Sequence, residues 1–179
     1  TGSKMKWRNA PVDELNASVK LDRDTIQILN LDFVNRTDWV RGKGMFHVGD
    51  DWWYQGDLRV KVGDLAGYAD LVQARYLTQL YGGKVQFDWS GSGNAKSVDG
   101  TVVGKIEGIR PVRPQGNWPQ AIRGEIDVKY GSGGIIFDAT EVGDGKVMVS
   151  GRGRVDKDGI RLERMQVKQG ERVALEGDI

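Results

Sequence analysis

The residues that could perform chemistry are few and scattered. His47 is the single histidine among 179 residues, and cysteine is absent. A zinc site at His47 would need companion ligands without any help from thiolates, and a Ser-His-Asp enzyme would need a nucleophile elbow that the sequence lacks. The absence of cysteine also excludes disulfides and a cysteine nucleophile. His47 is therefore expected to face solvent on the polar side of a strand.

Acidic and glycine-rich stretches predict turns rather than sites. The stretch 156–159 (DKDG) resembles the start of a calcium loop but lacks the third acidic ligand and the distal glutamate. Asp50 and Asp51 stand between two strand patterns, where acidic turn residues are common. The stretches GSGN and GSGG lack the lysine and helix that follow a phosphate loop. No metal and no cofactor is expected.

Aromatic and basic side chains suggest two binding modes. Trp52 and Trp53, with Trp39 and Trp89, could form a sugar-stacking platform, and an enzyme acting on glycans through Trp52, Trp53 and nearby acids is one hypothesis. Strand aromatics more often pack in a core or at a sheet edge. Three arginines near a proline-rich loop could meet an anionic head group, although a solvated loop is their usual setting: Arg110, Arg113 and Arg123. None of these sets identifies an active site, and a protein without enzymatic activity is expected.

Nearly the whole chain alternates apolar and polar residues, which is the two-residue period of strands with one buried face. Turn signals such as DRD, NRTD, VGDD, GSGN, VGDG and DKDG separate the alternating runs. The pattern predicts about eleven strands joined mostly by short antiparallel hairpins. The runs are 15–21, 25–34, 39–48, 54–62, 84–90, 98–108, 122–130, 135–140, 147–155, 160–168 and 172–179.

Two segments break this alternation. In the first, apolar residues recur at helical spacing, Asp64 can cap the amino end, and Gly82 or Gly83 can end the helix. A short helix is therefore predicted near 65–80. The second segment, 110–120, holds three of the four prolines and is predicted to be a loop. No apolar run approaches the ~18–20 residues of a membrane span, and no signal peptide is recognised.

Glycine is the strongest compositional signal. It accounts for 26 of 179 residues, about twice the ~7% found in an average protein. Hydrophobic-x-Gly units recur about 26 residues apart in the second half, which indicates a stack of two-strand units. Glycine on one face lets a sheet curl strongly toward that face, whereas bulges in an ordinary sandwich are the alternative explanation. The glycines in phase with apolar residues are Gly42, Gly44, Gly56, Gly100, Gly104, Gly108, Gly124, Gly151, Gly153 and Gly177.

The sequence therefore predicts a mostly β fold, a strongly curled, open antiparallel sheet of the groove type with one short helix. An acyl chain lying on its concave face would gain about 0.8 kcal/mol per buried methylene. A structural or adhesive β-solenoid with a filled core is one alternative, and a closed barrel holding a small apolar ligand is another. The candidate lipid-contacting residues are Val19, Leu21, Leu58, Val60, Val62, Val85, Phe87, Val102, Ile106, Ile126, Val128 and Val149.

Three stretches between about 12 and 109 carry a resemblance to a known family. They are VDELNASVKLDRDTIQILNLDFVNRTDWVRGKGMFHV, YQGDLRVKVGDLAGYADLV and GGKVQFDWSGSGNAKSVDGTVVGKIEGI. A strand ending in Asp-Leu runs into a short helix, and a Gly-Gly-Lys-Val strand with a Gly-Ser-Gly turn follows. In this the chain resembles the AsmA/TamB-like family of bacterial envelope proteins.

The resemblance implies a half-rolled sheet whose apolar trough moves phospholipid between inner and outer membranes, or supports outer-membrane assembly. It implies a periplasmic location in a Gram-negative-type bacterium, with the parent protein anchored in the inner membrane outside this segment. The implied partners are phospholipid or another acyl-chain lipid, neighbouring segments of the same parent chain and other envelope proteins. Nucleic acid is not expected as a partner, because the formal net charge is only +1.

Residues 1–179 are expected to form one repetitive β domain cut from a longer protein. Thr1, Gly2 and Ser3 have the composition of a cloning remnant, and the stretch RVALEGDI ends in the middle of a strand pattern.

Overall fold

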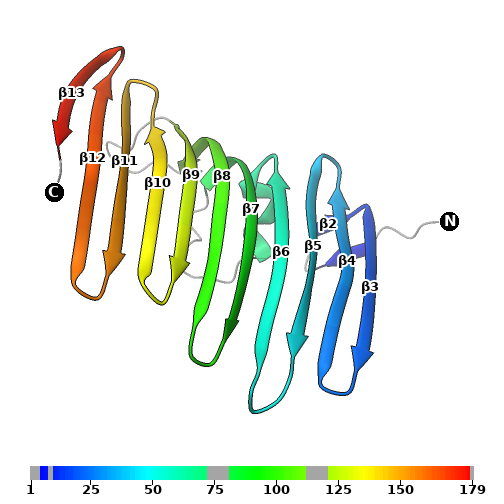
Figure 1. Ribbon diagram of the computed structural model, residues 1–179. Coiled ribbons are helices and arrows are strands. Elements are labelled where there is room, and N and C mark those ends of the chain that lie inside the picture. Colours follow the sequence, from blue (N-terminus) through cyan, green and yellow to red (C-terminus); the bar gives the residue numbers. More distant parts are fainter. Residues whose placement is uncertain (1–4, 8–9, 72–80, 112–120, 178–179) are drawn as a thin grey trace.

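The computed structural model describes residues 5–7, 10–71, 81–111 and 121–177 (Figure 1). A single 11-stranded sheet makes up most of these residues, and a separate two-stranded sheet precedes it. The small sheet pairs β1 (Met5–Trp7) with β2 (Ala10–Val12), a hairpin that the alternation did not predict. The strands of the large sheet are β3 (Glu14–Asp22), β4 (Thr25–Asn35), β5 (Asp38–His47), β6 (Trp53–Val62), β7 (Tyr81–Asn94), β8 (Val98–Pro111), β9 (Ile122–Gly131), β10 (Gly134–Gly143), β11 (Val147–Asp156), β12 (Gly159–Gln169) and β13 (Arg172–Gly177).

The large sheet is an antiparallel meander in which each strand pairs with the next strand in sequence. Each of the eleven predicted runs corresponds to one of these strands, although the run 39–48 passes the end of β5 by one residue and 178–179 lie outside the described residues. The expectation of a mostly β, antiparallel sheet is confirmed. One turn signal was wrong, because Gly91-Ser92-Gly93 continues β7 instead of ending it. The turn follows at Asn94, whose side-chain Oδ1 accepts the backbone N–H groups of Lys96 at 2.8 Å and Ser97 at 3.0 Å.

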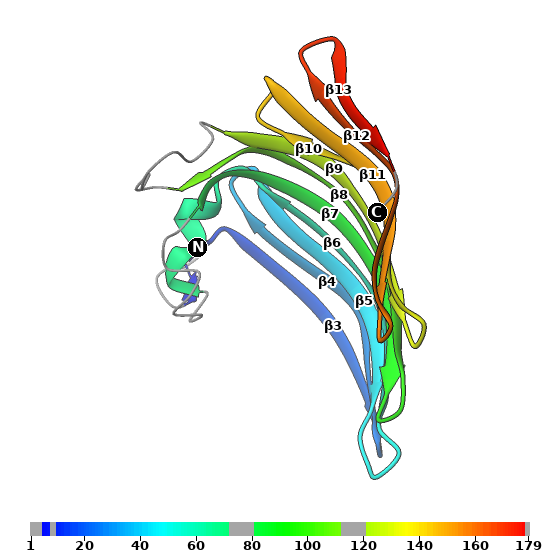
Figure 2. The ribbon, with the colours of Figure 1, turned by 90° about the vertical axis from the view of Figure 1, so that its left-hand side faces the viewer.

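The sheet is open and strongly curved, as expected. Its strand order ends at β3 on one side and at β13 on the other, and Figure 2 shows the strands bending in the same sense along the sheet. The alternative prediction of a closed barrel is therefore wrong. The solvent-accessible surface is 13313 Å², whereas a compact protein of 19.8 kDa exposes about 8,600 Å². A curved single layer keeps both of its faces accessible, which accounts for this excess.

The predicted helix is only partly described. Leu65–Leu71 form a short 3-10 helix, η1, and residues 72–80 of the predicted span lie outside the described residues. Asp64 caps η1 as expected, because its Oδ1 accepts the N–H of Ala66 at 3.1 Å and its carbonyl accepts that of Gly67 at 3.2 Å. The 3-10 form differs from the α-helix that the spacing predicted, in keeping with the usual shortness of 3-10 segments. The proline-rich loop was predicted to begin at residue 110, but Arg110 and Pro111 still belong to β8. The rest of that predicted loop, 112–120, lies outside the described residues. No described helix is long and apolar enough to cross a membrane.

Candidate functional site

The strand register aligns the apolar residues into rows that run across the sheet. Directly paired residues of neighbouring strands share a face, so each row can be followed from strand to strand. One row runs from β3 to β12 through Ala17, Leu31, Gly42, Leu58, Trp89, Val102, Val128, Phe137, Gly153 and Leu162. A parallel row runs from β6 to β13 through Val62, Val85, Ile106, Gly124, Val142, Val149, Val167 and Leu175.

The remaining candidate residues lie on the same face. Val60, Phe87 and Ile126 belong to a row between Val40 and Ile126 that also contains Gly104. Val19 pairs with Ile28, and Leu21 pairs with Ile26, at the β3 side of the sheet. The twelve predicted lipid-contacting residues therefore share one surface of the sheet, the trough.

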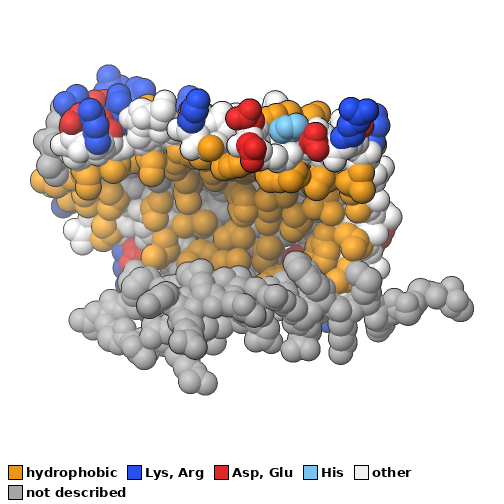
Figure 3. Space-filling model, turned by 90° about the horizontal axis from the view of Figure 1, so that it is seen from below, with side chains coloured by type: hydrophobic (Ala, Val, Ile, Leu, Met, Phe, Trp, Pro, Cys, Tyr) orange, Lys and Arg blue, Asp and Glu red, His pale blue; other side chains and the backbone are white. Residues whose placement is uncertain are grey.

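The trough is the concave side of the sheet. Figure 2 shows η1 on the concave side, and η1 contributes Tyr68 to a hollow of about 490 Å³. The same hollow is lined by trough residues, among them Leu15, Leu31, Phe33 and Val62. Figure 3 shows hydrophobic side chains gathered on this broad face, with charged side chains along its upper edge in that view. A second hollow of about 240 Å³ lies further along, lined by residues that include Phe137, Val149 and Met165.

The described residues do not fill the trough. Within the described part of the large sheet, Val60 is the one apolar side chain that is buried, with 8% of its surface exposed. Val19 remains 52% exposed and Leu21 73% exposed at one edge, and Leu175 remains 55% exposed at the other. Monomeric soluble proteins seldom expose contiguous apolar surface of this extent.

A row of glycines forms part of the trough floor. Gly44, Gly56, Gly91 and Gly100 are paired in succession across β5 to β8. A Cβ atom on Gly44 would lie 2.8 Å from the carbonyl oxygen of Gln55, so the backbone of the next strand already occupies that space. Gly100 is similarly crowded, because its added Cβ would lie 2.8 Å from the carbonyl oxygen of Ser90. At these two positions a side chain would require the strands to shift, which is consistent with the expected link between glycine and curling.

Aromatic rings cover the end of this glycine row. Trp52 stacks on Tyr54 and Tyr54 stacks on Trp89, with 6.4 Å between ring centroids in both pairs. The Nε1–H of Trp89 donates a hydrogen bond of 2.6 Å to the hydroxyl of Tyr130. A Cβ on Gly91 would lie 2.9 Å from that hydroxyl. Aromatic side chains over cross-strand glycines help to fix register. Sequence reasoning did not identify Tyr54 and Tyr130, because local alternation does not show which ring lies opposite which glycine.

The four candidate tryptophans do not form one platform. Trp52 and Trp89 belong to the aromatic ladder of the trough, whereas Trp53 stacks on His47 with 5.9 Å between ring centroids. Trp39 lies beneath the guanidinium of Arg41, 4.9 Å from the ring centroid. The reason is the two-residue period of a strand, which sends Trp53 and Tyr54 to opposite faces.

A polar cluster fixes η1 to the ends of β4 and β5. The Tyr68 hydroxyl donates to Oδ2 of Asp38 at 2.8 Å and accepts from Nδ2 of Asn35 at 2.9 Å. Oδ1 of Asp38 accepts the backbone N–H of Gly63 at 2.7 Å. Burial, followed by the hydrogen bond to Asp38, raises the pKa of Tyr68 above its ordinary value. Oδ1 of Asn35 is buried and has no hydrogen-bond partner among the described residues.

The convex face carries oppositely charged residues in directly paired positions. Arg41 and Asp32 approach to 3.0 Å, Lys43 and Asp57 to 3.7 Å, and Arg59 and Asp88 to 3.9 Å. Lys105 forms the same kind of pair with Glu125, and the hydrogen bond between them raises the pKa of Lys105. Exposed pairs of this kind contribute little to stability, but they keep the convex face hydrated.

The other candidate residues lie apart from the trough floor. His47 is half-buried rather than solvent-facing, because its ring stacks on Trp53 and its Nδ1 lies 3.3 Å from Oγ1 of Thr25. The DKDG stretch is a hairpin turn in which Asp156 pairs with Gly159, and Asp50 and Asp51 connect β5 to β6, as predicted. No three His, Asp or Glu side chains of the described residues are grouped as metal ligands.

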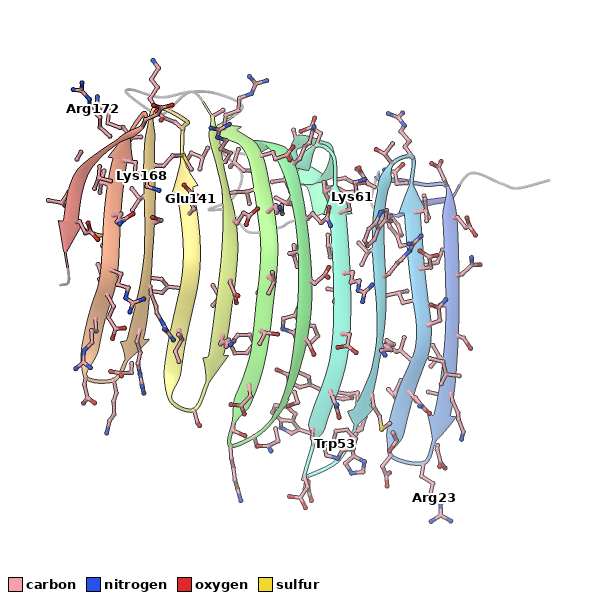
Figure 4. All side chains as sticks on the ribbon, turned by 45° about the horizontal axis from the view of Figure 1, so that its top comes forward. Arg23, Trp53, Lys61, Glu141, Lys168 and Arg172 are labelled. Carbon is pink, nitrogen blue, oxygen red and sulfur yellow. The ribbon has the colours of Figure 1, made fainter. Side chains whose placement is uncertain are left out.

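Charged residues mark the two ends of the strands. Figure 4 shows Lys61, Lys168 and Arg172 near one end and Arg23 with Trp53 near the other. Of the three arginines proposed for an anionic head group, Arg110 is the second-last residue of β8 and Arg123 is the second residue of β9. Arg113 lies outside the described residues.

Comparison of the chain with protein-family models, with curated proteins and with solved structures finds no match.

Proposed function

We propose that this protein binds lipid, with the acyl chains lying in the trough and the head group at its charged rim. The observation that carries the proposal is the exposure of apolar rows on the concave face of an open sheet. Apolar surface costs free energy in water at about 25 cal/mol per Å², so an occupant that covers it is stabilised.

The dimensions of the trough suit an acyl chain. Ten spacings of about 4.8 Å separate the outer strands of the sheet, which makes the trough about 48 Å long. A single acyl chain spans about half of the ~30 Å hydrocarbon core of a bilayer, so it would occupy only part of the length of the trough. Because the apolar rows are continuous, a bound acyl chain meets similar side chains at many positions. The acyl chain can therefore move along the trough without losing any specific contact.

The wider role follows from the resemblance to AsmA/TamB-like proteins. We propose that the trough takes part in phospholipid transport between inner and outer membranes or in outer-membrane assembly, in the periplasm. Neighbouring segments of a longer parent chain and other envelope proteins are the partners proposed for that role. The trough requires no catalytic group, so the proposed activity is binding and conduction rather than catalysis.

Two neighbouring valines provide a matched test of lipid binding. Val102 lies in the trough row between Trp89 and Val128, whereas Val103 lies on the opposite face between Asp88 and Asp127. Val102→Lys places a charge in the path of the acyl chain, and Val103→Lys places the same charge between two carboxylates. Lipid that co-purifies with each protein from bacterial membranes would be extracted and counted by mass spectrometry.

We expect Val102→Lys to lose most of the bound lipid and Val103→Lys to keep it. Circular dichroism would verify that both variants retain the β spectrum of the original protein. Equal lipid content in the two variants, or no lipid in the original protein, would contradict the proposed function.

A further inference from the structure

The outer edge of β3 is the longest unpaired backbone in the described residues. All nine residues of Glu14–Asp22 are exposed, and β3 pairs with β4 on its other side alone. Its apolar residues, Leu15, Ala17, Val19 and Leu21, belong to the trough, while Glu14, Asn16, Ser18 and Lys20 alternate on the convex face. An exposed edge of this length is a template for another strand.

The direction of the strands selects the partner geometry. Ten antiparallel steps separate β3 from β13, so the two edge strands run in the same direction. A copy added head to tail would therefore join β13 to β3 in a parallel pair. A two-fold axis perpendicular to the sheet instead joins β3 to β3 of a second copy in an antiparallel pair. This arrangement keeps both apolar faces on the same side, so the trough continues from one copy into the next.

We propose that two copies of this chain associate through β3 in an antiparallel pair centred on Ala17. In this register Glu14 lies opposite Lys20 of the second copy, and the two-fold axis repeats this ion pair. Leu15 lies opposite Val19 of the second copy within the trough. A register centred on Ser18 instead places Glu14 opposite Asp22, which is repulsive. Charge complementarity therefore selects the Ala17 register, whatever the trough holds.

Charge reversal tests the pairing without altering the core. Glu14→Lys creates two repulsive Lys–Lys pairs in the dimer, and Lys20→Glu creates two Glu–Glu pairs. Each variant alone should dimerise at least about tenfold more weakly than the original protein in analytical ultracentrifugation. An equimolar mixture of the two variants restores both attractive pairs, so heterodimers should form with the original affinity. Arg172→Glu, a charge reversal on the opposite edge strand, should leave the affinity unchanged.

Because the chain has no cysteine, a single introduced thiol reports the register directly. Ala17→Cys places the two thiols at the two-fold axis, on Cα atoms about 5 Å apart, which permits a disulfide. Leu21→Cys places them about 26 Å apart within the same pair. Oxidation should crosslink the first variant and leave the second monomeric on a denaturing gel.

Three results would overturn the proposal. The chain could sediment as a monomer at all concentrations, the mixed charge variants could fail to associate, or Leu21→Cys could crosslink as readily as Ala17→Cys. Dimerisation that is lost in Arg172→Glu would assign the interface to β13 and also contradict it.

Discussion

The indole of Trp89 donates its N–H to the Tyr130 hydroxyl at 2.6 Å, and this bond joins β7 to β9 over the intervening strand β8. It can cross because the residue of β8 that pairs with Tyr130 is Gly100, which carries no side chain to separate the two rings. The glycine row and the aromatic ladder therefore depend on each other. The missing side chains bring the rings to the floor of the trough, and the rings hold the register of three strands.

This bond predicts a specific loss of stability. Tyr130→Phe keeps the ring over the glycines but leaves the Trp89 N–H without its acceptor, so the free energy of unfolding should fall by about 1 kcal/mol. Urea denaturation measures the difference. Tyr54→Phe is the control, because the Tyr54 hydroxyl has no hydrogen bond to the described residues, and it should change the stability by less than half as much. Equal losses in the two variants would show that the hydrogen bond contributes little.

The close approach of strands at the glycine row predicts intolerance to the smallest side chain. Gly44→Ala would bring its Cβ to 2.8 Å from the carbonyl oxygen of Gln55, so the free energy of unfolding should fall by about 1–3 kcal/mol. Gly177→Ala on β13 is the matched control, since nothing lies within 4 Å of its added Cβ. Thermal unfolding should show a lower Tm for the first variant and an unchanged or slightly higher Tm for the second.

The Tyr68 cluster predicts a pH dependence at alkaline pH. The pKa of Tyr68 is raised in the folded protein above its ordinary value of 10.0, so folding favours the protonated hydroxyl. Its contribution to stability is present below pH 10 and is lost as the pH rises through the folded-state pKa. Tyr68→Phe should be less stable at neutral pH, by about 1–3 kcal/mol, because Asn35 and Asp38 lose their partner. Urea titrations at several pH values should show this difference shrinking above pH 10, and a constant difference would rule out the hydroxyl as its source.

The hairpin between β10 and β11 predicts that the stability of the fold depends on pH in the acid range. Oδ1 of Asp144 accepts the backbone N–H groups of Val147 and Lys146, and these bonds hold the pKa of Asp144 below its ordinary value of 3.8. The resulting stabilisation is present above that value and is lost as the pH falls through the folded-state pKa. Asp144→Ala should therefore lose less stability than the original protein on acidification below pH 4. Asp158→Ala in the next hairpin, whose carboxylate has no such bond among the described residues, should follow the original protein.

The sequence was sufficient to locate the strands and to divide their residues between two faces. The run 54–62 became β6 (Trp53–Val62) and the run 122–130 became β9 (Ile122–Gly131), because the two-residue period and the turn residues are local properties of the chain. The same local pattern placed Val60 and Val128 on one surface with the glycines.

The tertiary structure decided which residues of different strands meet. One extra residue in β4 shifts its pairing with β3 between Ser18 and Val19, and no local pattern announces such a bulge. The Gly91-Ser92-Gly93 stretch has the composition of a turn, but the ring of Tyr130 beside Gly91 shows why the structure uses it as strand. Register therefore determined that Trp89 of β7 meets Tyr54 of β6 and Tyr130 of β9, whereas alternation alone excludes Trp53 from that ladder.

Openness, too, was decided by the assembled sheet. Alternation specifies that a strand has an apolar face, but the same alternation serves a filled solenoid, a closed barrel or a trough. Whether β3 and β13 meet depends on the curvature summed over all the strands between them. A small change in the curvature contributed by each strand separates a closed barrel from an open sheet. The amino acids determined the two faces strand by strand, and the accumulated bend of the whole sheet left the apolar one uncovered.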